Sequence, residues 1–143
     1  MSMPLALEPK SPITRRRTAA ARCAVAAAAA LARVSPYRLH RVLTLLGRRA
    51  RPATGPEALA ARTAVVSVSV RCAGSGCLQR SIATVLLCRL SGSWPSWCTG
   101  VLTSPFRAHA WVEVDGVAIG EGDMPPFRKI MEIPAGGREG AAP

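Results

Sequence analysis

Apolar residues recur at helical spacing along the first two thirds of the chain, and a partly alternating apolar–polar pattern follows. The helical spacing predicts helices at about residues 15–34, 36–46, 56–70 and 77–91. The alternating pattern predicts strands at 97–102 and 106–114, with a hairpin partner at 117–121. Helices followed by a short antiparallel sheet predict an α+β fold.

Capping signals mark the starts of three of these helices. Thr14 precedes the first, and Ser35-Pro36 begins the second with serine as N-cap and proline at N1. Thr54 caps the third, with Glu57 three residues later. A β-branched run in the second half of this third helix leaves its pattern ambiguous between helix and strand.

The length of 143 residues fits one domain with a modest core. We expect this domain to cover residues 15–133, with a helical part at 15–70 and a second part at 71–133. The proline-rich residues 1–14 and the Gly/Ala/Pro-rich residues 134–143 are expected to be disordered tails.

Positive charge is concentrated in the N-terminal part of the chain. The formal net charge is +11, and fifteen of the nineteen Lys and Arg residues lie in residues 1–89, which contain only two acids. Such asymmetry favours an acidic partner, such as nucleic acid, an anionic membrane surface or an acidic peptide. A GC-rich genome, which favours Arg and Ala codons, explains the same composition without any partner. The chain has no RNA-binding signature and no aromatic stacking platform, so we expect no nucleic-acid partner.

The five cysteines are an odd number, and the chain shows no secretory signal peptide. Both observations favour a cytoplasmic location with free thiols. The apolar run at 23–32 is about half of the roughly 20 residues needed to cross a bilayer, so we expect no membrane span. We also expect no cofactor and no metal, because a C-x2-C pair is missing from the ligands that a zinc site would use: Cys72, Cys77, Cys88, Cys98 and His109.

Cys77 and His109 are the residues that carry candidate chemistry. Cys77 follows a Gly-Ser-Gly segment at the predicted start of a helix, where the helix dipole lowers the pKa of a thiol. We expect its own N–H to be available as an oxyanion donor. His109 lies on the predicted strand 106–114, two residues before Trp111. A thiol at a helix start that faces an imidazole on a strand is typical of a cysteine nucleophile with its base.

The register of the predicted hairpin decides which acid lies beside His109. A three-residue loop would pair His109 with Glu121 and place Asp123 as a diagonal neighbour. A two-residue Asp115-Gly116 turn would shift the register by one and remove both acids from that face. Asp115 itself is expected to be a turn residue, since it lies about 20 Å further along the strand than His109. We therefore predict Glu121 as the third catalytic residue, with Asp123 as the alternative.

Four sequence motifs surround these residues: Cys77-Leu-Gln-Arg-Ser81, Trp94-Pro-Ser-Trp97-Cys98, Phe106-Arg-Ala-His109-Ala-Trp-Val-Glu113 and Val117-Ala-Ile-Gly-Glu121. Together they resemble the motifs of the lasso peptide B2 proteins, which are leader peptidases of the transglutaminase-like cysteine protease superfamily. The resemblance runs from about residue 31 to residue 121. It implies a papain-like core, in which the helix that begins with the cysteine packs on a short antiparallel sheet that carries the histidine and an acid. The family's acid is usually an aspartate, whereas the matching position here is a glutamate.

The resemblance also implies a reaction, with residues 71–133 as the catalytic part. A cysteine peptidase of this kind removes the leader from a ribosomally made lasso peptide precursor through a thioester acyl-enzyme. The freed core amine is then used in a macrolactam, which an ATP-dependent, asparagine-synthetase-like cyclase forms. A separate leader-binding protein is implied as a further partner. Three roles remain open for the basic helices at 15–62. They are a docking surface for that protein, a docking surface for an acidic stretch of the leader, or a solvated face.

Two other function classes remain open. One is an acyl or amide transferase on the same Cys77–His109 pair, with an amine in place of water as the acceptor. The other is a basic, non-enzymatic binding module, whose function would survive Cys77→Ala and whose binding would fall steeply with salt.

Candidates for the wall of an active site beside Cys77 and His109 are Gln79, Trp94 and Trp97.

Overall fold

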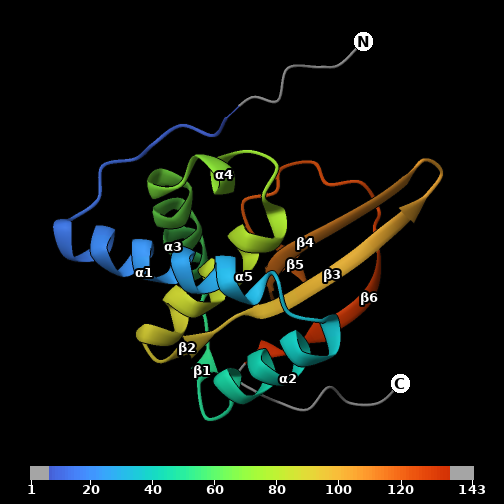
Figure 1. Ribbon diagram of the computed structural model, residues 1–143, viewed down its shortest axis with the longest axis horizontal. Helices are drawn as coiled ribbons and strands as arrows, with labels where there is room; N and C mark the ends of the chain where they lie inside the picture. Colours follow the sequence, from blue (N-terminus) through green and yellow to red (C-terminus); the bar gives the residue numbers. More distant parts are fainter. Residues whose placement is uncertain (1–6, 136–143) are drawn as a thin grey trace.

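The computed structural model describes residues 7–135, and the outer parts of the two predicted tails, 1–6 and 136–143, lie outside this range. Its helices are α1 (Arg15–Leu31), α2 (Pro36–Gly47), α3 (Gly55–Val68), α4 (Val70–Ala73) and α5 (Cys77–Leu90). They precede the main sheet along the chain and lie beside it in space, so the α+β prediction is confirmed (Figure 1). No helix among the described residues has the length and apolarity to cross a bilayer.

The predicted caps begin these helices. The Thr14 hydroxyl accepts a hydrogen bond from the Arg17 N–H at 3.2 Å, and the Ser35 hydroxyl caps α2. Thr54 and Glu57 form a reciprocal capping box at the start of α3. Each of these caps satisfies a backbone N–H group that has no partner within its helix.

The predicted third helix is interrupted at Ser69. Its backbone is extended, with φ −136° and ψ 118°, and its hydroxyl accepts a hydrogen bond from the Cys72 N–H at 3.2 Å. Ser69 therefore ends α3 and caps the short α4. The β-branched run before it is helical as far as Val68, which resolves the ambiguity of the sequence pattern in favour of helix.

Helix α5 lies at the centre of the molecule and contacts α1, α3 and β4. Its side chains are buried on nearly all sides, which is typical of a central helix. α1 presents a stripe of buried alanines toward the interior: Ala21, Ala24 and Ala28. Such small side chains allow two helix backbones to approach closely, and the close packing of α1 brings its C-terminal end near the start of α5.

The main sheet is antiparallel, with the strand order β5-β4-β3-β6. Its strands are β3 (Ser96–Thr103), β4 (Phe106–Val114), β5 (Val117–Ala118) and β6 (Arg128–Ile133). The sequence predicted β3 and β4, made β5 too long and missed β6. A parallel pair, β1 (Arg51–Pro52) with β2 (Ser93–Trp94), was also missed. Edge strand β6 is mostly exposed, so it lacks the apolar periodicity that marks a half-buried strand.

Residues 7–14 differ from the expected disordered tail. The Glu8 N–H donates to the carbonyl oxygen of Ala73 at 3.1 Å, and the Ser11 N–H donates to the Ser67 hydroxyl at 2.9 Å. Ile13 packs against the core. This segment therefore runs along α3 and α4, and it brings a carboxylate toward the functional site.

Candidate active site

Cys77, His109 and Glu121 lie in contact where the first turn of α5 meets β4. The Cys77 sulfur lies close enough to the His109 ring and to the Ala110 N–H for both groups to lower the pKa of the thiol. Within residues 7–135 no strand covers the outer edge of β4 at this point, because β5 ends at Ala118. His109 Nε2 lies 2.9 Å from Glu121 Oε2, which leaves Nδ1 for the thiol. The structure thus brings together the three residues that the sequence analysis singled out.

The hairpin before Glu121 has a different turn from the one that predicted this contact. Asp115 and Gly116 have φ values of 51° and 78°, as a type I′ turn requires, and Val114 pairs with Val117. The turn therefore contains two residues, and the three-residue loop is wrong. The assignment of Asp115 to the turn is confirmed.

Glu121 reaches His109 because the chain leaves the strand after Ala118. Gly120 and Gly122 adopt φ values of 71° and 59°, which redirect the backbone. A Cβ on Gly120 would lie 2.7 Å from Cδ of Arg62, so only glycine allows this close approach. The two-residue turn does not remove both acids from His109, since the strand register no longer applies at Glu121.

Asp123, the alternative acid, is exposed and has no hydrogen bond or ion pair within residues 7–135. The carboxylate beside the imidazole is therefore the glutamate of the Val117–Glu121 motif. The longer side chain of glutamate, compared with aspartate, reaches the ring from a loop.

Burial opposes ionisation of Cys77, yet the surroundings lower the pKa of its thiol. The hydrogen bonds from His109 and from the Ala110 N–H outweigh burial, and the positive charges of His109 and Arg80 add to them. The site therefore favours a thiolate, which is the nucleophilic form of cysteine.

The pKa of His109 is raised to about 9, first by its hydrogen bond to Cys77 and then by that to Glu121. Burial of Glu121 is likewise outweighed, so that His109, Arg62 and Arg80 lower the pKa of its carboxyl. The directions of these three pKa shifts favour a thiolate, an imidazolium and a carboxylate. The protonated ring donates a hydrogen bond from each nitrogen, which fixes its orientation.

Two arginines that the sequence analysis overlooked surround Glu121. Arg62 is buried on α3, with Nη2 3.6 Å from Glu121 Oε1, and it makes a bidentate ion pair with Glu8 at 2.7 and 2.8 Å. Arg80 Nη2 lies 4.0 Å from the same oxygen, and its Nη1 binds the carbonyl oxygens of Cys72 and Gly74. A signal for Arg62 was present, because it lies at helical spacing among buried alanines and valines of α3.

The expected oxyanion donor is already engaged. The Cys77 N–H donates to the carbonyl oxygen of Ser75 at 3.0 Å, so the prediction that it is free is wrong. Within residues 7–135 the N–H groups of Leu78 and Gln79 have no acceptor, and the helical ladder begins with Arg80 N–H to Gly76. The free donors at this helix start therefore belong to the two residues after Cys77.

The walls of the site differ in part from those expected. Trp94 and Trp97 belong to the core, and only Gln79 lines a pocket with Cys77. The aromatic residues near His109 are Trp111, stacked at 5.8 Å between ring centroids, and Phe127, tilted at 5.3 Å. These rings shield one side of the imidazole from water.

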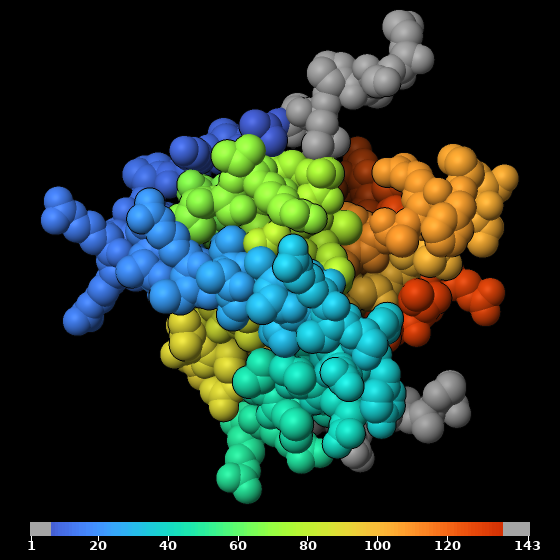
Figure 2. Space-filling view, viewed as in Figure 1, coloured from blue at the N-terminus to red at the C-terminus, as the bar shows by residue number. Residues whose placement is uncertain are grey.

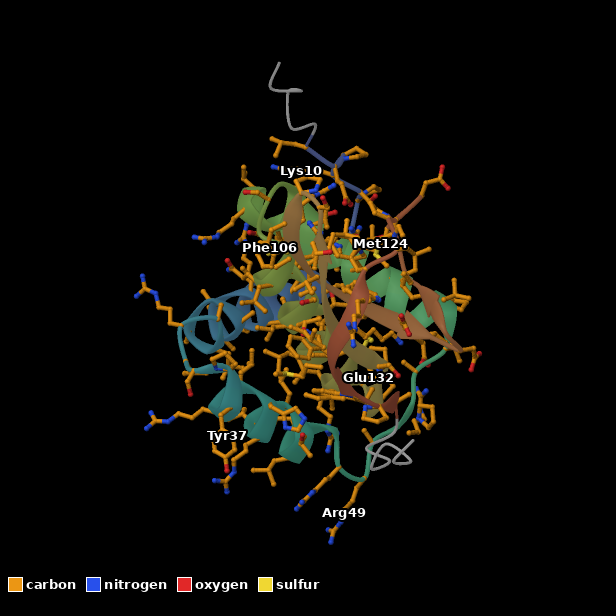
Figure 3. The ribbon with its side chains drawn as sticks, turned by 90° about the vertical axis from the view of Figure 1, so that its right-hand side faces the viewer. Lys10, Tyr37, Arg49, Phe106, Met124 and Glu132 are labelled. Carbon is orange, nitrogen blue, oxygen red and sulfur yellow. The ribbon has the colours of Figure 1, made fainter. Side chains whose placement is uncertain are left out.

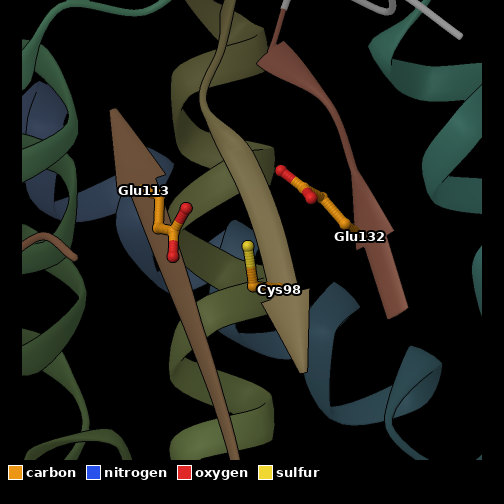
Figure 4. A group of neighbouring side chains, drawn as sticks. All are labelled: Cys98, Glu113 and Glu132. Atoms are coloured by element: carbon orange, nitrogen blue, oxygen red, sulfur yellow. The ribbon is translucent and has the colours of Figure 1, made fainter. Parts of the chain in front are cut away.

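A second group of side chains, Cys98, Glu113 and Glu132, lies on β3, β4 and β6 (Figure 4). The Lys129 ammonium lies 2.8 Å from Glu113 Oε2 and 3.8 Å from Glu132 Oε2, and Trp111 Nε1 donates to Glu113 at 2.9 Å. A lysine and an indole N–H therefore supply the partners of these carboxylates. Burial, followed by the charge of Glu113, raises the pKa of Cys98 to about 12, so this thiol stays protonated.

A family model described as the transglutaminase-like superfamily matches residues 13–132. The match spans the helices, the main sheet and all three members of the Cys77–His109–Glu121 cluster. Searches of curated proteins and of solved structures returned no match.

Proposed function

Because this chain belongs to the transglutaminase-like superfamily, we propose that it is a cysteine peptidase that removes the leader from a ribosomally made lasso peptide precursor. The observation that carries the proposal is the contact chain from the Cys77 thiol through His109 to Glu121. The superfamily includes cysteine peptidases and transferases, and the motifs around these residues resemble those of the B2 leader peptidases.

The first half of the reaction forms an acyl-enzyme. The Cys77 thiolate attacks the carbonyl carbon that joins leader and core, and a C–S bond forms. His109 then gives a proton to the nitrogen of the core as the C–N bond breaks. The core leaves as a free amine, and the C-terminal residue of the leader stays on Cys77 as a thioester.

The second half releases the leader. Neutral His109 takes a proton from water as the water oxygen attacks the thioester carbonyl. The C–S bond breaks, and the products are the leader acid and the Cys77 thiolate beside protonated His109. The thiolate and imidazolium with which the cycle began are thereby restored.

Four further groups assist these steps. Glu121 orients the His109 ring and stabilises its charge, since it accepts the hydrogen bond from Nε2. We assign the Leu78 N–H as an oxyanion donor, because it is free at the start of α5 and Leu78 lines the pocket beside Cys77. Arg62 and Arg80 are positioning residues that hold Glu121.

Two partners follow from this reaction. A separate leader-binding protein would present the precursor, with the basic helices in residues 15–62 as its docking surface. An ATP-dependent, asparagine-synthetase-like cyclase would use the freed core amine.

A reconstitution tests the proposal. The chain is mixed with a precursor peptide and a leader-binding protein, and the products are identified by mass spectrometry. We expect free leader acid and free core from the wild type, and neither product from Cys77→Ala. A leader–amine adduct would assign the transferase alternative, and cleavage that survives Cys77→Ala would contradict the thiol mechanism.

A further inference from the structure

A pocket of about 560 Å³ lies beside Cys77, between the C-terminal end of α1 and the loop that precedes α5. In Figure 2 the light blue end of α1 lies against the green residues of this loop. The volume lies within the range of roughly 300–1,000 Å³ that is usual for small-ligand pockets. Because Cys77 is part of the lining, a group that fills this pocket lies next to the nucleophile.

The charged residues of the pocket are all positive. Arg33 and Arg71 line it, together with alanines of α1, and no carboxylate of the described residues 7–135 belongs to its lining. Both arginines are exposed, and neither takes part in an ion pair within residues 7–135. By contrast, Arg51, Arg62 and Arg80 all lie near acids. The pocket therefore carries two positive charges that the rest of the described chain leaves without a counterion.

The backbones of these two arginines are held in place. The Gly74 and Gly76 N–H groups both donate to the Arg71 carbonyl oxygen, at 3.2 and 3.0 Å. A Cβ on Gly76 would lie 2.8 Å from Cγ of Arg71, so the arginine stem occupies the space that a side chain would need. The Arg33 N–H donates to the Ala30 carbonyl oxygen in the turn that ends α1. The loop that presents Cys77 thus also presents Arg71.

We propose that this pocket binds a carboxylate of the substrate peptide, namely an Asp or Glu side chain within one or two residues of the bond that Cys77 attacks. This inference rests on the proposed function. A guanidinium group binds a carboxylate through two parallel hydrogen bonds, and both arginines line the same pocket as Cys77. Arg33 and Arg71 are therefore specificity residues, and they take no part in proton transfer.

Two alkylating reagents of similar size test the charge of the pocket without any peptide. Iodoacetate is an anion and iodoacetamide is neutral, and each forms a C–S bond with the Cys77 thiolate as iodide leaves. Nearby positive charge concentrates the anion at Cys77. We therefore expect the rate with iodoacetate, divided by the rate with iodoacetamide, to fall about threefold or more in the Arg33→Gln/Arg71→Gln double variant. An unchanged ratio would overturn the proposal.

A matched control removes the same charge elsewhere. Arg38 and Arg41 lie on α2 outside the lining of this pocket, and Arg41 stacks over Tyr37, which projects outward from the helix in Figure 3. The Arg38→Gln/Arg41→Gln variant should keep the wild-type ratio. An equal fall of the rate ratio in this variant would assign the effect to the net charge of the protein. It would also overturn the proposal that the pocket binds a carboxylate. Thermal unfolding of each variant checks that it is folded.

Peptidyl chloromethyl ketones that carry Glu or Gln beside the reactive group extend the test to peptides. We expect the Glu reagent to inactivate the wild type several-fold faster than the Gln reagent, and the double variant to lose this preference. Equal rates in the wild type would overturn the proposal. If the preference appears but no precursor is cleaved in the reconstitution, the anion pocket stands and the leader-peptidase function fails.

Discussion

Cys77 and Cys98 are two thiols near glutamates, yet their pKa values shift in opposite directions. Cys98 is fully buried, and burial together with the charge of Glu113 raises its pKa to about 12. Cys77 is also desolvated, but the imidazole of His109 lies between it and Glu121 and lowers the pKa of the thiol. A carboxylate near a thiol therefore suppresses the thiolate directly, and supports it only through a protonated ring.

The two glutamates differ in the same way. Glu113 pairs with the Lys129 ammonium and accepts a hydrogen bond from the Trp111 indole N–H, and among the described residues its carboxylate bonds to neither His109 nor Cys77. Glu121 is surrounded by Arg62, Arg80 and His109, and the contact with His109 continues to the Cys77 thiol. Similarly buried carboxylates thus accompany packing of the sheet at one site and the proposed proton transfer at the other.

The largest expected effect is the difference in reactivity between the two thiols. With a pKa of about 12, only about one part in 10⁵ of Cys98 is thiolate at pH 7, and its burial also blocks reagents. We expect iodoacetamide to modify Cys77 at least about 10³-fold faster than Cys98, as measured by peptide mapping of the native protein. His109→Ala should lower the rate at which iodoacetamide modifies Cys77 and leave the rate at Cys98 unchanged. Comparable rates of modification for the two thiols would contradict the opposite pKa shifts of Cys77 and Cys98.

A matched pair of carboxamides separates the two glutamates. Glu121→Gln should lower kcat/KM for precursor cleavage by roughly 10²-fold, because the His109 ring loses its anionic partner. Glu113→Gln should leave kcat/KM per folded molecule within about twofold, since its carboxylate contacts no reacting group. Steady-state assays at equal concentrations of folded protein provide the comparison. Equal losses in both variants would show that the sheet, and not the orientation of the imidazole, limits the rate.

The pH dependence of cleavage sharpens the role of Glu121. Activity should rise as the Cys77 thiol ionises below its ordinary pKa, and fall as the His109 imidazolium loses its proton near pH 9. Cys77 and then Glu121 raise the pKa of His109, so in Glu121→Gln the falling limb should move from about pH 9 to a lower pH. Profiles of kcat/KM against pH measure the shift. A falling limb that stays at about pH 9 in this variant would remove Glu121 from the proton-transfer unit.

The smallest expected effect is on the free energy of unfolding at the Cys98 site. Lys129→Met leaves the buried Glu113 carboxylate without its ammonium partner and should lower the free energy of unfolding by about 1–3 kcal/mol. Urea denaturation measures this change, and Lys129→Arg is the matched control that keeps the charge. Cleavage by the folded variant should be unchanged. A loss of cleavage at unchanged stability would instead connect Glu113 to the active site.

Local signals predicted the helices well, whereas contacts distant in sequence escaped prediction. The caps at Thr14, Ser35 and Thr54 depend on hydrogen bonds within three residues, so the sequence carries them directly. Strand β6 pairs with β3 across about 30 residues and offers an exposed face with no clear periodicity. Its existence depends on the completed sheet, which no local pattern encodes.

The proposed catalytic acid shows how a correct contact followed from an incorrect register. Alternation along β4 placed His109 and Trp111 on one face, and their rings are stacked. The count from His109 to Glu121 assumed a long β5, but the chain leaves the strand through Gly120 in the left-handed region. The side-chain contact survives because Arg62 and Arg80 attract the carboxylate, and neither arginine entered the sequence argument.

The ion pair between Glu8 and Arg62 has a consequence for the design of shorter versions of this protein. The family match begins at residue 13, so a fragment cut there would retain Cys77, His109 and Glu121. It would lack Glu8, and Arg62 would then have only Glu121 as a carboxylate partner among the described residues. Arg62 would compete with His109 for that carboxylate. Removal of residues 1–12 would therefore disturb the carboxylate of the proposed site although Cys77, His109 and Glu121 all remain.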